Sequence, residues 1–170
     1  YAVQLAGEIN ASAALGLFEG CPGRMTDPAI VNGAEIISAD SRQVYKGMDI
    51  GTGKDLSEYG DIPYHLIDIL PAGAQYNVFQ FQQDFRRVWA DIRSRRMVPI
   101  LCGGTGMYIN AVTAGYDFTS KVSLSAGRGP SEAEGLPRRP YFIGTLVSRE
   151  VRNERIDRRL DTRLKEGMVE

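Results

Sequence analysis

The sequence is poor in histidine and cysteine and has no long apolar run. One of its 170 residues is histidine and two are cysteine, and Cys21 and Cys102 form no CxxC pair, so a zinc site is not predicted. No stretch approaches the about 20 apolar residues that cross a bilayer, and no secretory signal opens the chain. We expect a monomeric, cytoplasmic protein that does not bind a membrane.

The chain also lacks an excess of charge of either sign. Its formal net charge is −1 and 24% of its residues are charged, a balance that is not typical of a disordered chain. It also argues against a generic nucleic-acid-binding protein, which carries a strong basic excess. A local basic surface is compatible with this balance, because basic residues gather between Arg149 and Lys165.

Short apolar runs alternate with helical periodicity in the middle of the chain. Ala34–Ala39 and Val98–Cys102 are predicted as strands, and apolar residues recur at helical spacing from Val78 to Ile92. A further helix is predicted over Met107–Thr113, after the glycine turn Gly103–Gly106. This alternation predicts an α/β fold with a parallel sheet, in which ligands bind at the carboxyl ends of the strands.

The flanking segments are predicted from weaker patterns. We expect a helix end at Val3–Ile9, a loop over 10–33, a strand at Tyr141–Leu146 and a basic helix over 148–166. Residues 119–140 are rich in Ser, Gly, Pro and Arg. The predicted parts of the chain are a core over 1–118, a linker over 119–140, and a return strand with a basic helix over 141–170.

The stretch Gly51-Thr52-Gly53-Lys54-Asp55 resembles a phosphate-binding loop but departs from it at both ends. That loop has the pattern G-x-x-x-x-G-K-[ST], whereas Met48 and Asp55 stand here at its first and last positions. The hydroxyl that would hold magnesium is missing, and a carboxylate in its place repels phosphate. A glycine turn is the better interpretation.

Asp40 is the leading candidate for chemistry, because it closes a predicted strand. A carboxylate there can act as a general base towards a substrate amine or hydroxyl, or it can cap a following helix. Three polar residues follow it: Ser41, Arg42 and Gln43. The turn Gly103–Gly106 presents N–H groups and the Thr105 hydroxyl to an anion or a nucleobase edge, or needs glycine for its backbone alone.

Three further features have plainer interpretations. His65 is predicted to be a buried, hydrogen-bonded histidine rather than a ligand, and Cys102 a small core residue. The basic helix is either a solvated helix with internal salt bridges or a surface that contacts nucleic-acid phosphates.

Four blocks of the sequence, in the same order, resemble the tRNA dimethylallyltransferases (tRNA isopentenyltransferases). They are EIISADSRQVYKGMDIGTGKD, YHLIDI, VPILCGGTGMYINAV and RIDRRLDTRLKEGMVE. The first and third blocks are specific, and the resemblance covers residues 1–10, 34–118 and 140–170. It implies a P-loop nucleoside-kinase-like parallel sheet with flanking helices and a partial C-terminal helical region.

The resemblance also implies a reaction and a set of site residues. The reaction transfers a dimethylallyl group from dimethylallyl diphosphate to N6 of an adenosine next to the anticodon in tRNA, with Mg²⁺ as cofactor. The resemblance implies that Asp40 is the general base and that Thr105 lies at the reaction site. Both would also bind tRNA, together with Ser41, Arg42 and Gln43. Arg149 would bind the diphosphate.

The sequence departs from the family in three places. No phosphate loop is present, residues 11–31 resemble an insertion, and residues 119–139 stand where the family has a helical insertion with further tRNA contacts. Two alternatives therefore stay open: a fragment of a P-loop nucleotide kinase, and an RNA-binding paralogue without transfer activity. The missing loop favours the second for the chain as written.

The resemblance predicts a phosphate loop immediately before Tyr1. Tyr1–Ile9 resembles the helix that follows such a loop in the family, and Tyr1 is not an initiator methionine. We expect the reading frame upstream of Tyr1 to encode G-x-x-x-x-G-K-[ST], which sequencing the gene would check. A frame that begins at Tyr1, or an upstream segment without the pattern, contradicts this prediction.

Overall fold

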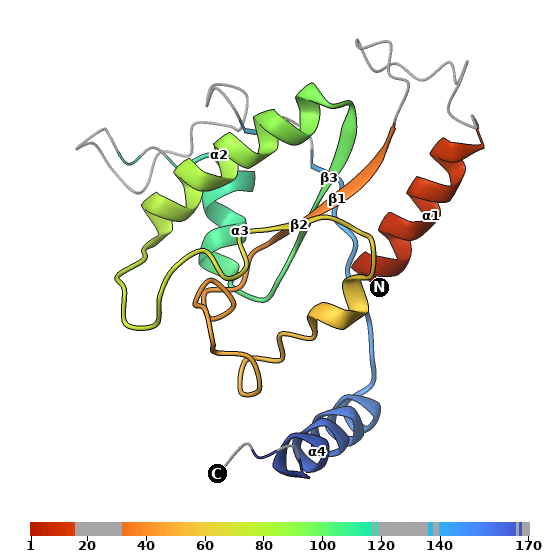
Figure 1. Ribbon diagram of the computed structural model, residues 1–170, viewed down its shortest axis with the longest axis vertical. Coiled ribbons are helices and arrows are strands. Elements are labelled where there is room, and N and C mark those ends of the chain that lie inside the picture. Colours follow the sequence, from red (N-terminus) through yellow and green to blue (C-terminus); the bar gives the residue numbers. More distant parts are fainter. Residues whose placement is uncertain (16–31, 117, 119–135, 138–139, 166, 168–170) are drawn as a thin grey trace.

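A three-stranded parallel sheet forms the centre of the computed structural model, which describes residues 1–15, 32–116, 118, 136–137, 140–165 and 167 (Figure 1). Its strands, in the order β2-β1-β3, are β1 (Gly33–Ser38), β2 (Tyr64–His65) and β3 (Met97–Cys102). β1 pairs in parallel with β3 from Gly33 opposite Met97 to Ser38 opposite Cys102. The predicted α/β fold with a parallel sheet is confirmed.

Helices cover both faces of this sheet (Figure 1). Alternate residues of β1 face opposite sides, as in any strand: Ala34 and Ile36 pack against Ala6, while Ile37 packs with Phe81 and Phe85. β1 is therefore buried along its whole length, as strands of parallel sheets usually are. The helices are α1 (Ala2–Ala14) on one face, and α2 (Val78–Ser94) and α3 (Gly106–Thr113) on the other.

The sequence of α2 explains where this helix begins and which side it buries. Asn77 and Gln80 form a capping box, each side chain bonding to the backbone of the other, which satisfies two amides that the first turn leaves without partners. Phe81, Phe85 and Ile92 are buried at the predicted helical spacing. The predicted helix is confirmed.

The predicted loop over residues 10–33 is wrong for its first part. α1 continues to Ala14, through the sequence Asn-Ala-Ser-Ala-Ala, because alanine has the strongest intrinsic preference for the helix. The carbonyl oxygen of the Asn10 side chain accepts a hydrogen bond from the Ala34 amide at 2.6 Å, which ties α1 to β1. Residues 16–31 of that predicted loop, and 119–135 and 138–139 of the predicted linker, lie outside the described residues.

The strand predicted at Tyr141–Leu146 is also wrong. Residues 140–148 have no regular secondary structure, and Tyr141 and Leu146 are 90% and 100% exposed. β-propensity reflects packing on a half-buried pleated surface rather than a backbone preference. Within the described part of the chain no neighbouring strand pairs with this segment, so its apolar composition alone does not form a strand.

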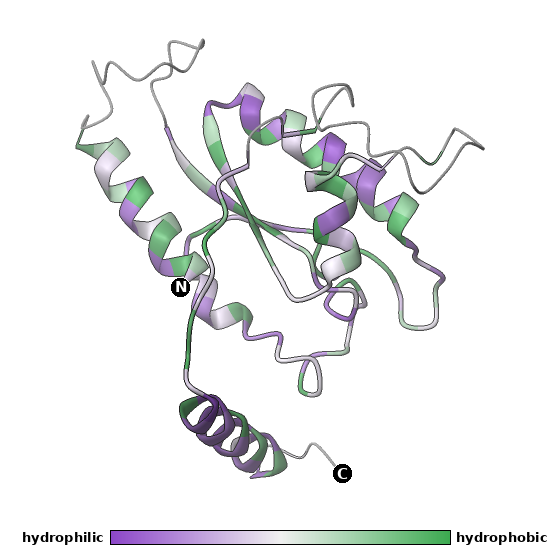
Figure 2. Ribbon diagram, turned by 180° about the vertical axis from the view of Figure 1, so that it is seen from behind, coloured by the Kyte–Doolittle hydropathy of each residue, from purple (hydrophilic) through white to green (hydrophobic). Residues whose placement is uncertain are grey.

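The predicted basic helix is confirmed as α4 (Arg149–Lys165), which has no buried residue. It lies apart from the sheet and its helices (Figure 1), and most of its residues are hydrophilic with fewer apolar ones among them (Figure 2). Seven of its residues are basic and four are acidic. Within the described residues, none of the helices combines the length and the apolar character that a membrane crossing requires.

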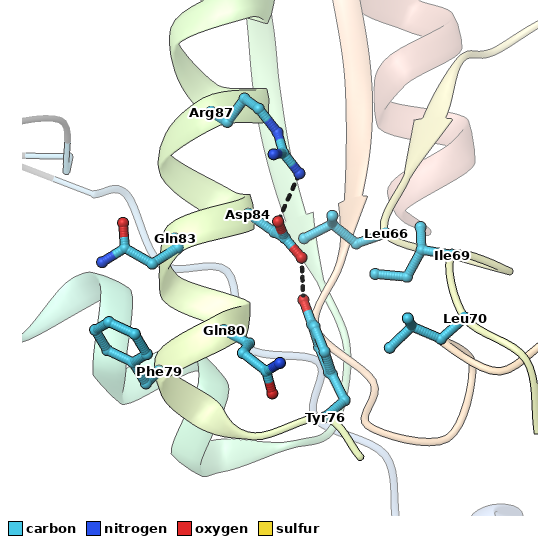
Figure 3. Close-up of a pocket in the computed structure, with 9 residues that line it drawn as sticks. All are labelled: Leu66, Ile69, Leu70, Tyr76, Phe79, Gln80, Gln83, Asp84 and Arg87. Carbon is cyan, nitrogen blue, oxygen red and sulfur yellow. Dashed lines mark hydrogen bonds and ion pairs between the residues drawn. The ribbon is translucent and has the colours of Figure 1, made fainter. Parts of the chain in front are cut away.

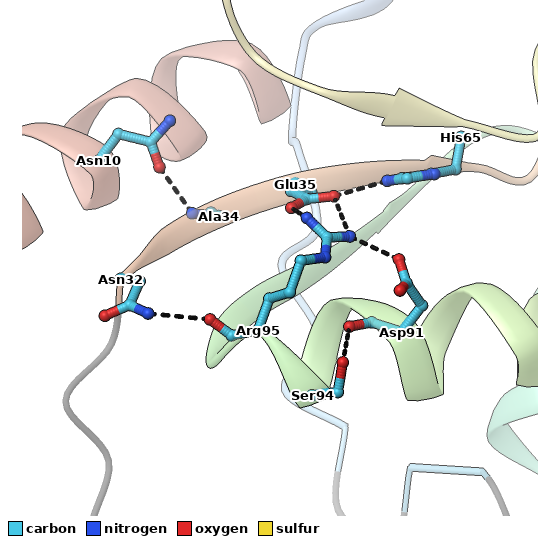
Figure 4. A network of polar contacts seen from close by, with 8 residues as sticks. All are labelled: Asn10, Asn32, Ala34, Glu35, His65, Asp91, Ser94 and Arg95. Atoms are coloured by element: carbon cyan, nitrogen blue, oxygen red, sulfur yellow. Dashed lines mark hydrogen bonds and ion pairs between the residues drawn. The ribbon is translucent and has the colours of Figure 1, made fainter.

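A polar network fixes the end of α2 to the sheet (Figure 4). Glu35 of β1 is 1% exposed, and its carboxylate accepts hydrogen bonds from both terminal nitrogens of Arg95. His65 Nε2 lies 2.6 Å from Glu35 Oε2, and Arg95 also pairs with Asp91 at 2.7 Å. The hydrogen bond predicted for His65 is confirmed, although its side chain is partly rather than fully buried.

Removing the cation of this network should destabilise the protein. Arg95→Met leaves the buried Glu35 carboxylate with His65 as its remaining side-chain partner, and an under-satisfied buried polar group costs about 1–3 kcal/mol. Urea denaturation should show a lower midpoint, corresponding to this loss in the free energy of unfolding. Arg87→Met, which breaks an ion pair whose arginine is 78% exposed, should change stability by less than about 0.5 kcal/mol. Equal midpoints for the two variants contradict the prediction.

Candidate functional site

The carboxyl ends of β1 and β3 meet at a point where no side chain fits. A Cβ on Gly103 would lie 2.8 Å from the Cα of Ala39 and closer still to its carbonyl group. The Ala39 amide donates to the Cys102 carbonyl at 2.7 Å, and the Thr105 amide donates to the Ala39 carbonyl at 3.0 Å. Gly103 is therefore needed so that the two backbones can approach each other.

This approach brings together residues that are 64 positions apart in the chain. The Ser41 amide donates to Thr105 Oγ1 at 2.9 Å, and the Thr105 hydroxyl donates to Ser41 Oγ at 3.3 Å. Asp40 stands between Ala39 and Ser41, both of which Thr105 contacts. Of the residues predicted from the sequence, Asp40, Ser41 and Thr105 thus lie together at the strand ends; we call them, with Arg42 and Gln43, the strand-end cluster.

Asp40 is half-buried, and its two carboxylate oxygens differ in their hydrogen bonding. Its Oδ1 accepts a hydrogen bond from the Arg42 amide at 2.8 Å, while Oδ2 has no hydrogen-bond partner within the described residues. Asp40 therefore caps a turn, and the alternative that it caps a helix is wrong, because turns follow it directly. The free oxygen can accept a proton from a ligand.

The next two residues of the cluster face different surroundings. Gln43 turns back towards β1, where its Oε1 accepts a hydrogen bond from the Ser38 hydroxyl at 3.0 Å. Arg42 is exposed, so its guanidinium is available to an anion in solution. The cluster therefore combines a carboxylate, hydroxyl groups, an amide and one accessible cation.

Tyr108 is a residue of this region that the sequence analysis did not select. It follows Thr105 by one helical turn, with its amide bonded to the Thr105 carbonyl at 2.9 Å. Tyr108 as a whole is 5% exposed, and its ring stacks on that of Phe81 at 4.1 Å between centroids. Burial raises the pKa of Tyr108, and the charges of Tyr45 and Asp40 raise that pKa further. The signal in the sequence was its spacing of three residues from Thr105.

A cavity of about 390 Å³ lies between α2 and the segment 66–70 (Figure 3). The Tyr76 hydroxyl donates to Asp84 Oδ2 at 2.8 Å, and Arg87 pairs with Asp84 Oδ1 at 2.6 Å. Burial and the hydrogen bond to Asp84 both raise the pKa of Tyr76. Tyr76 contacts Tyr108 edge to face. None of the residues that line this cavity belongs to the strand-end cluster, so the cavity is separate from the candidate site.

The Lys54 side chain is buried, and its ammonium group forms three hydrogen bonds within the protein. Its side chain is 0% exposed, and its ammonium group donates to the Tyr45 carbonyl at 2.7 Å, to Asp49 Oδ1 at 3.0 Å and to Asp68 Oδ1. Burial alone would lower the pKa of Lys54, but the hydrogen bonds to Asp68 and Asp49 outweigh it and the pKa is raised. The prediction of a turn rather than a phosphate loop is confirmed, since this cation is closed to a ligand.

The structure also bears on two further residues, Arg149 and Cys102, and on whether a metal ion could bind. The structure does not bring Arg149, the first residue of α4, into contact with the strand-end cluster. Cys102 is exposed, so its prediction as a core residue is wrong; it is the last residue of β3, which pairs with one strand, β1, in the described sheet. In the part of the chain that the structure describes, no three His, Cys, Asp or Glu side chains are grouped so that they could hold a metal ion.

Comparison with known proteins gives consistent similarities. A family model described as IPP transferase matches residues 43–135. A tRNA dimethylallyltransferase 2 of Shewanella sediminis is 40% identical over 183 residues, covering 80% of this chain and 61% of the relative. The crystal structure of the full-length tRNA isopentenylpyrophosphate transferase of Bacillus halodurans matches with a TM-score of 0.67 and 27% identity, covering 95% of this chain and 63% of that one.

A third similarity is to a eukaryotic dimethylallyltransferase, whose structures are described as snapshots of the enzyme acting on tRNA. It matches with a TM-score of 0.53 and 26% identity over 72% of this chain and 26% of that one. This chain spans about three fifths of the length of the Shewanella relative, 61%. The 183 aligned positions exceed the 170 residues of the chain, so that relative carries residues, within the aligned region, that this chain lacks.

The close approach at Gly103 can be tested with two glycines of the same turn. Gly103→Ala forces the ends of β1 and β3 apart and should cost about 1–3 kcal/mol of stability or more, as overpacking does. Gly104→Ala is the matched control, because a Cβ there meets nothing within 4 Å, and it should stay within about 0.5 kcal/mol of the unchanged protein. Urea denaturation followed by circular dichroism measures both; similar midpoints would falsify the close approach.

Proposed function

Because the chain belongs to the IPP transferase family, we propose that the protein transfers a dimethylallyl group from dimethylallyl diphosphate to N6 of an adenosine next to the anticodon of tRNA. The observation that carries the proposal is the position of Asp40, with a free carboxylate oxygen, beside Thr105 at the ends of β1 and β3. We further propose that the protein works in the cytoplasm as a monomer.

The proposed reaction makes one bond and breaks one. The N6 lone pair attacks C1 of the dimethylallyl group, the C1–O bond breaks, and diphosphate leaves with the electron pair of that bond. The attacking nitrogen then carries an extra proton, which Asp40 Oδ2 accepts. An exocyclic amine is a weak nucleophile because its lone pair is conjugated with the ring, so a positioned proton acceptor lowers the barrier.

Thr105 has a positioning role in this scheme. Its hydroxyl is bonded to both the amide and the hydroxyl of Ser41, and these contacts hold the backbone on the C-terminal side of Asp40. The Ala39 carbonyl, bonded to the Thr105 amide, holds the other side. The adenine must leave its stack in the anticodon loop to reach Asp40, at a cost of a few kcal/mol, and contacts to Ser41, Arg42 and Gln43 would offset that cost.

Basic side chains support a tRNA partner. Arg42 is exposed at the strand-end cluster, and α4 carries seven basic residues on a helix without a buried side chain. Lys and Arg side chains that neutralise phosphates supply most of the affinity for nucleic acids. The named activity of the relatives on tRNA agrees with this use of the basic residues.

The diphosphate side of the reaction rests on the resemblance. Arg149 is proposed to approach the diphosphate, and Mg²⁺ is proposed as the cofactor that neutralises the leaving group. The described residues do not fit a magnesium site by themselves, since they offer no group of three metal-binding side chains. The steps proposed for Asp40 and Thr105 therefore do not depend on the metal.

Of the two alternatives, the comparisons weaken one. A fragment of a P-loop nucleotide kinase would be expected to resemble kinases, whereas the matching family model is described as IPP transferase and the relatives are named tRNA dimethylallyltransferases. An RNA-binding protein without transfer activity differs from the proposal in one property, the rate of transfer, which the next experiment measures.

Replacing Asp40 by asparagine should separate chemistry from binding. Asp40→Asn keeps the shape and removes the proton acceptor, so single-turnover transfer from labelled dimethylallyl diphosphate to tRNA should slow by about 10²- to 10⁴-fold. The transfer assay uses the product of the whole reading frame. Filter binding of tRNA to the 170-residue chain at two salt concentrations should show salt-sensitive affinity that Asp40→Asn leaves nearly unchanged.

The control is Asp61→Asn, which removes an exposed carboxylate from the loop before β2 and should leave both measurements unchanged. An unaltered transfer rate in Asp40→Asn would restrict Asp40 to capping its turn. Salt-sensitive RNA binding without transfer by the unchanged protein would instead support the RNA-binding alternative.

A further inference from the structure

On one side of the Gly51–Asp55 turn, Lys54 contacts the segments that lie next to the strand-end cluster. The segment that follows Gln43 runs beside residues 68–70: the Asp68 amide donates to the Gln43 carbonyl at 3.0 Å, and the Ile69 amide to the Val44 carbonyl at 2.9 Å. Lys54 bridges the two segments, because its ammonium group binds the Tyr45 carbonyl and Asp68 Oδ1 together. The turn therefore fixes the backbone that leaves Asp40 and Gln43.

The segment that Lys54 holds is conformationally strained. Leu66 and Asp68 have φ angles of 62° and 55°, in the left-handed region that residues other than glycine rarely adopt. Such conformations persist only where the surrounding contacts over-determine them. The contacts of Lys54 and Gln43 with Asp68 supply that constraint.

The outer side of the same turn holds helix α4. Arg163 of α4 forms an ion pair with Asp55, and the Arg163 side chain is 17% exposed, whereas the other residues of this helix are exposed. Arg159 Nη1 lies 3.6 Å from the point where a Cβ of Gly53 would stand. One turn of five residues thus contacts the chain beside the strand-end cluster on one side and the basic helix on the other.

We propose that the Gly51–Asp55 turn is a bracket that fixes helix α4 relative to the strand-end cluster, so that both contact the same RNA molecule. Lys54 is the inner positioning residue and Asp55 the outer one. Neither contacts phosphate, because Lys54 is closed off by three oxygen atoms and Asp55 is an anion. Two contact surfaces held at a fixed separation bind one partner more tightly than the same surfaces joined loosely.

The bracket rests on the proposed function, and two variants of equal charge test it. Asp55→Asn removes the ion pair between Asp55 and Arg163, and Glu154→Gln, the matched control, removes the ion pair between Glu154 and Arg158 within α4. Each variant loses one negative charge, which by itself strengthens binding to RNA. We expect Asp55→Asn nevertheless to weaken binding of an anticodon stem-loop RNA by about 5- to 10-fold, and Glu154→Gln to bind at least as tightly as the unchanged chain.

The inner side of the bracket needs a control for stability. Lys54→Met removes a buried cation that pairs with two partly exposed carboxylates, and Arg95→Met removes a cation that pairs with the buried Glu35, so both variants should unfold more easily. At a temperature where both are folded, Lys54→Met should weaken RNA binding while the slope of log affinity against log salt stays unchanged, since no phosphate contact is lost. Arg95→Met should bind RNA within about twofold of the unchanged chain.

A distance measurement separates this proposal from the proposed function. Spin labels are attached through Lys46→Cys and Arg152→Cys in a background with Cys21→Ser and Cys102→Ser. The distribution of label distances without RNA should be narrow in this background and with Glu154→Gln, and broad with Asp55→Asn. If the unchanged chain binds no RNA, the proposed function fails while the label distances still test the bracket. A narrow distribution in Asp55→Asn, or unchanged RNA affinity in that variant, overturns the bracket.

Discussion

The hydrogen bond from the Thr105 amide to the Ala39 carbonyl, formed over the missing side chain of Gly103, is the contact on which the candidate site depends. Parallel strands alone leave neighbouring carboxyl ends separated by an inter-strand spacing of about 4.8 Å. Here the turn after β3 folds back over the end of β1, so α3 begins next to Ala39 and Ser41, the two neighbours of Asp40 in the chain. That placement makes the Thr105 hydroxyl available to the Ser41 amide and gives the Asp40 carboxylate a fixed backbone on both sides.

The elements around this contact were predictable because their signals are local. The buried run of β1, the helical spacing of Phe81, Phe85 and Ile92, and the glycine turn after β3 are each readable within a few residues. The resemblance implied that Asp40 and Thr105 share one site, and their positions agree with a general rule, that carboxyl ends of neighbouring parallel strands share one edge of the sheet. The strand predicted at Tyr141–Leu146 failed for the opposite reason, since a strand also needs a partner that the segment's own sequence does not specify.

Other parts of the site could not be predicted, because their contacts join distant residues. The three oxygen atoms that enclose Lys54 come from Tyr45, Asp49 and Asp68, and no local pattern links these residues. Tyr108 carried a weak signal through its spacing from Thr105, whereas its stacking on Phe81 depends on how α2 and α3 pack. The motif spacing indicated that Lys54 is not the lysine of a phosphate loop, whereas its three partners became known only from the fold.

The burial of Lys54 also limits how charge is distributed in the proposed reaction. Its ammonium group lies between two aspartates, so its field towards a ligand is largely cancelled by its own partners. A diphosphate leaving group needs positive charge aimed at the oxygen on which charge develops, and Lys54 cannot provide it. The described core instead offers the proposed proton acceptor, Asp40, and an exposed cation at Arg42. The nucleophile and the leaving group of the proposed reaction are therefore served by separate parts of the protein, and this chain's strand-end cluster serves the nucleophile.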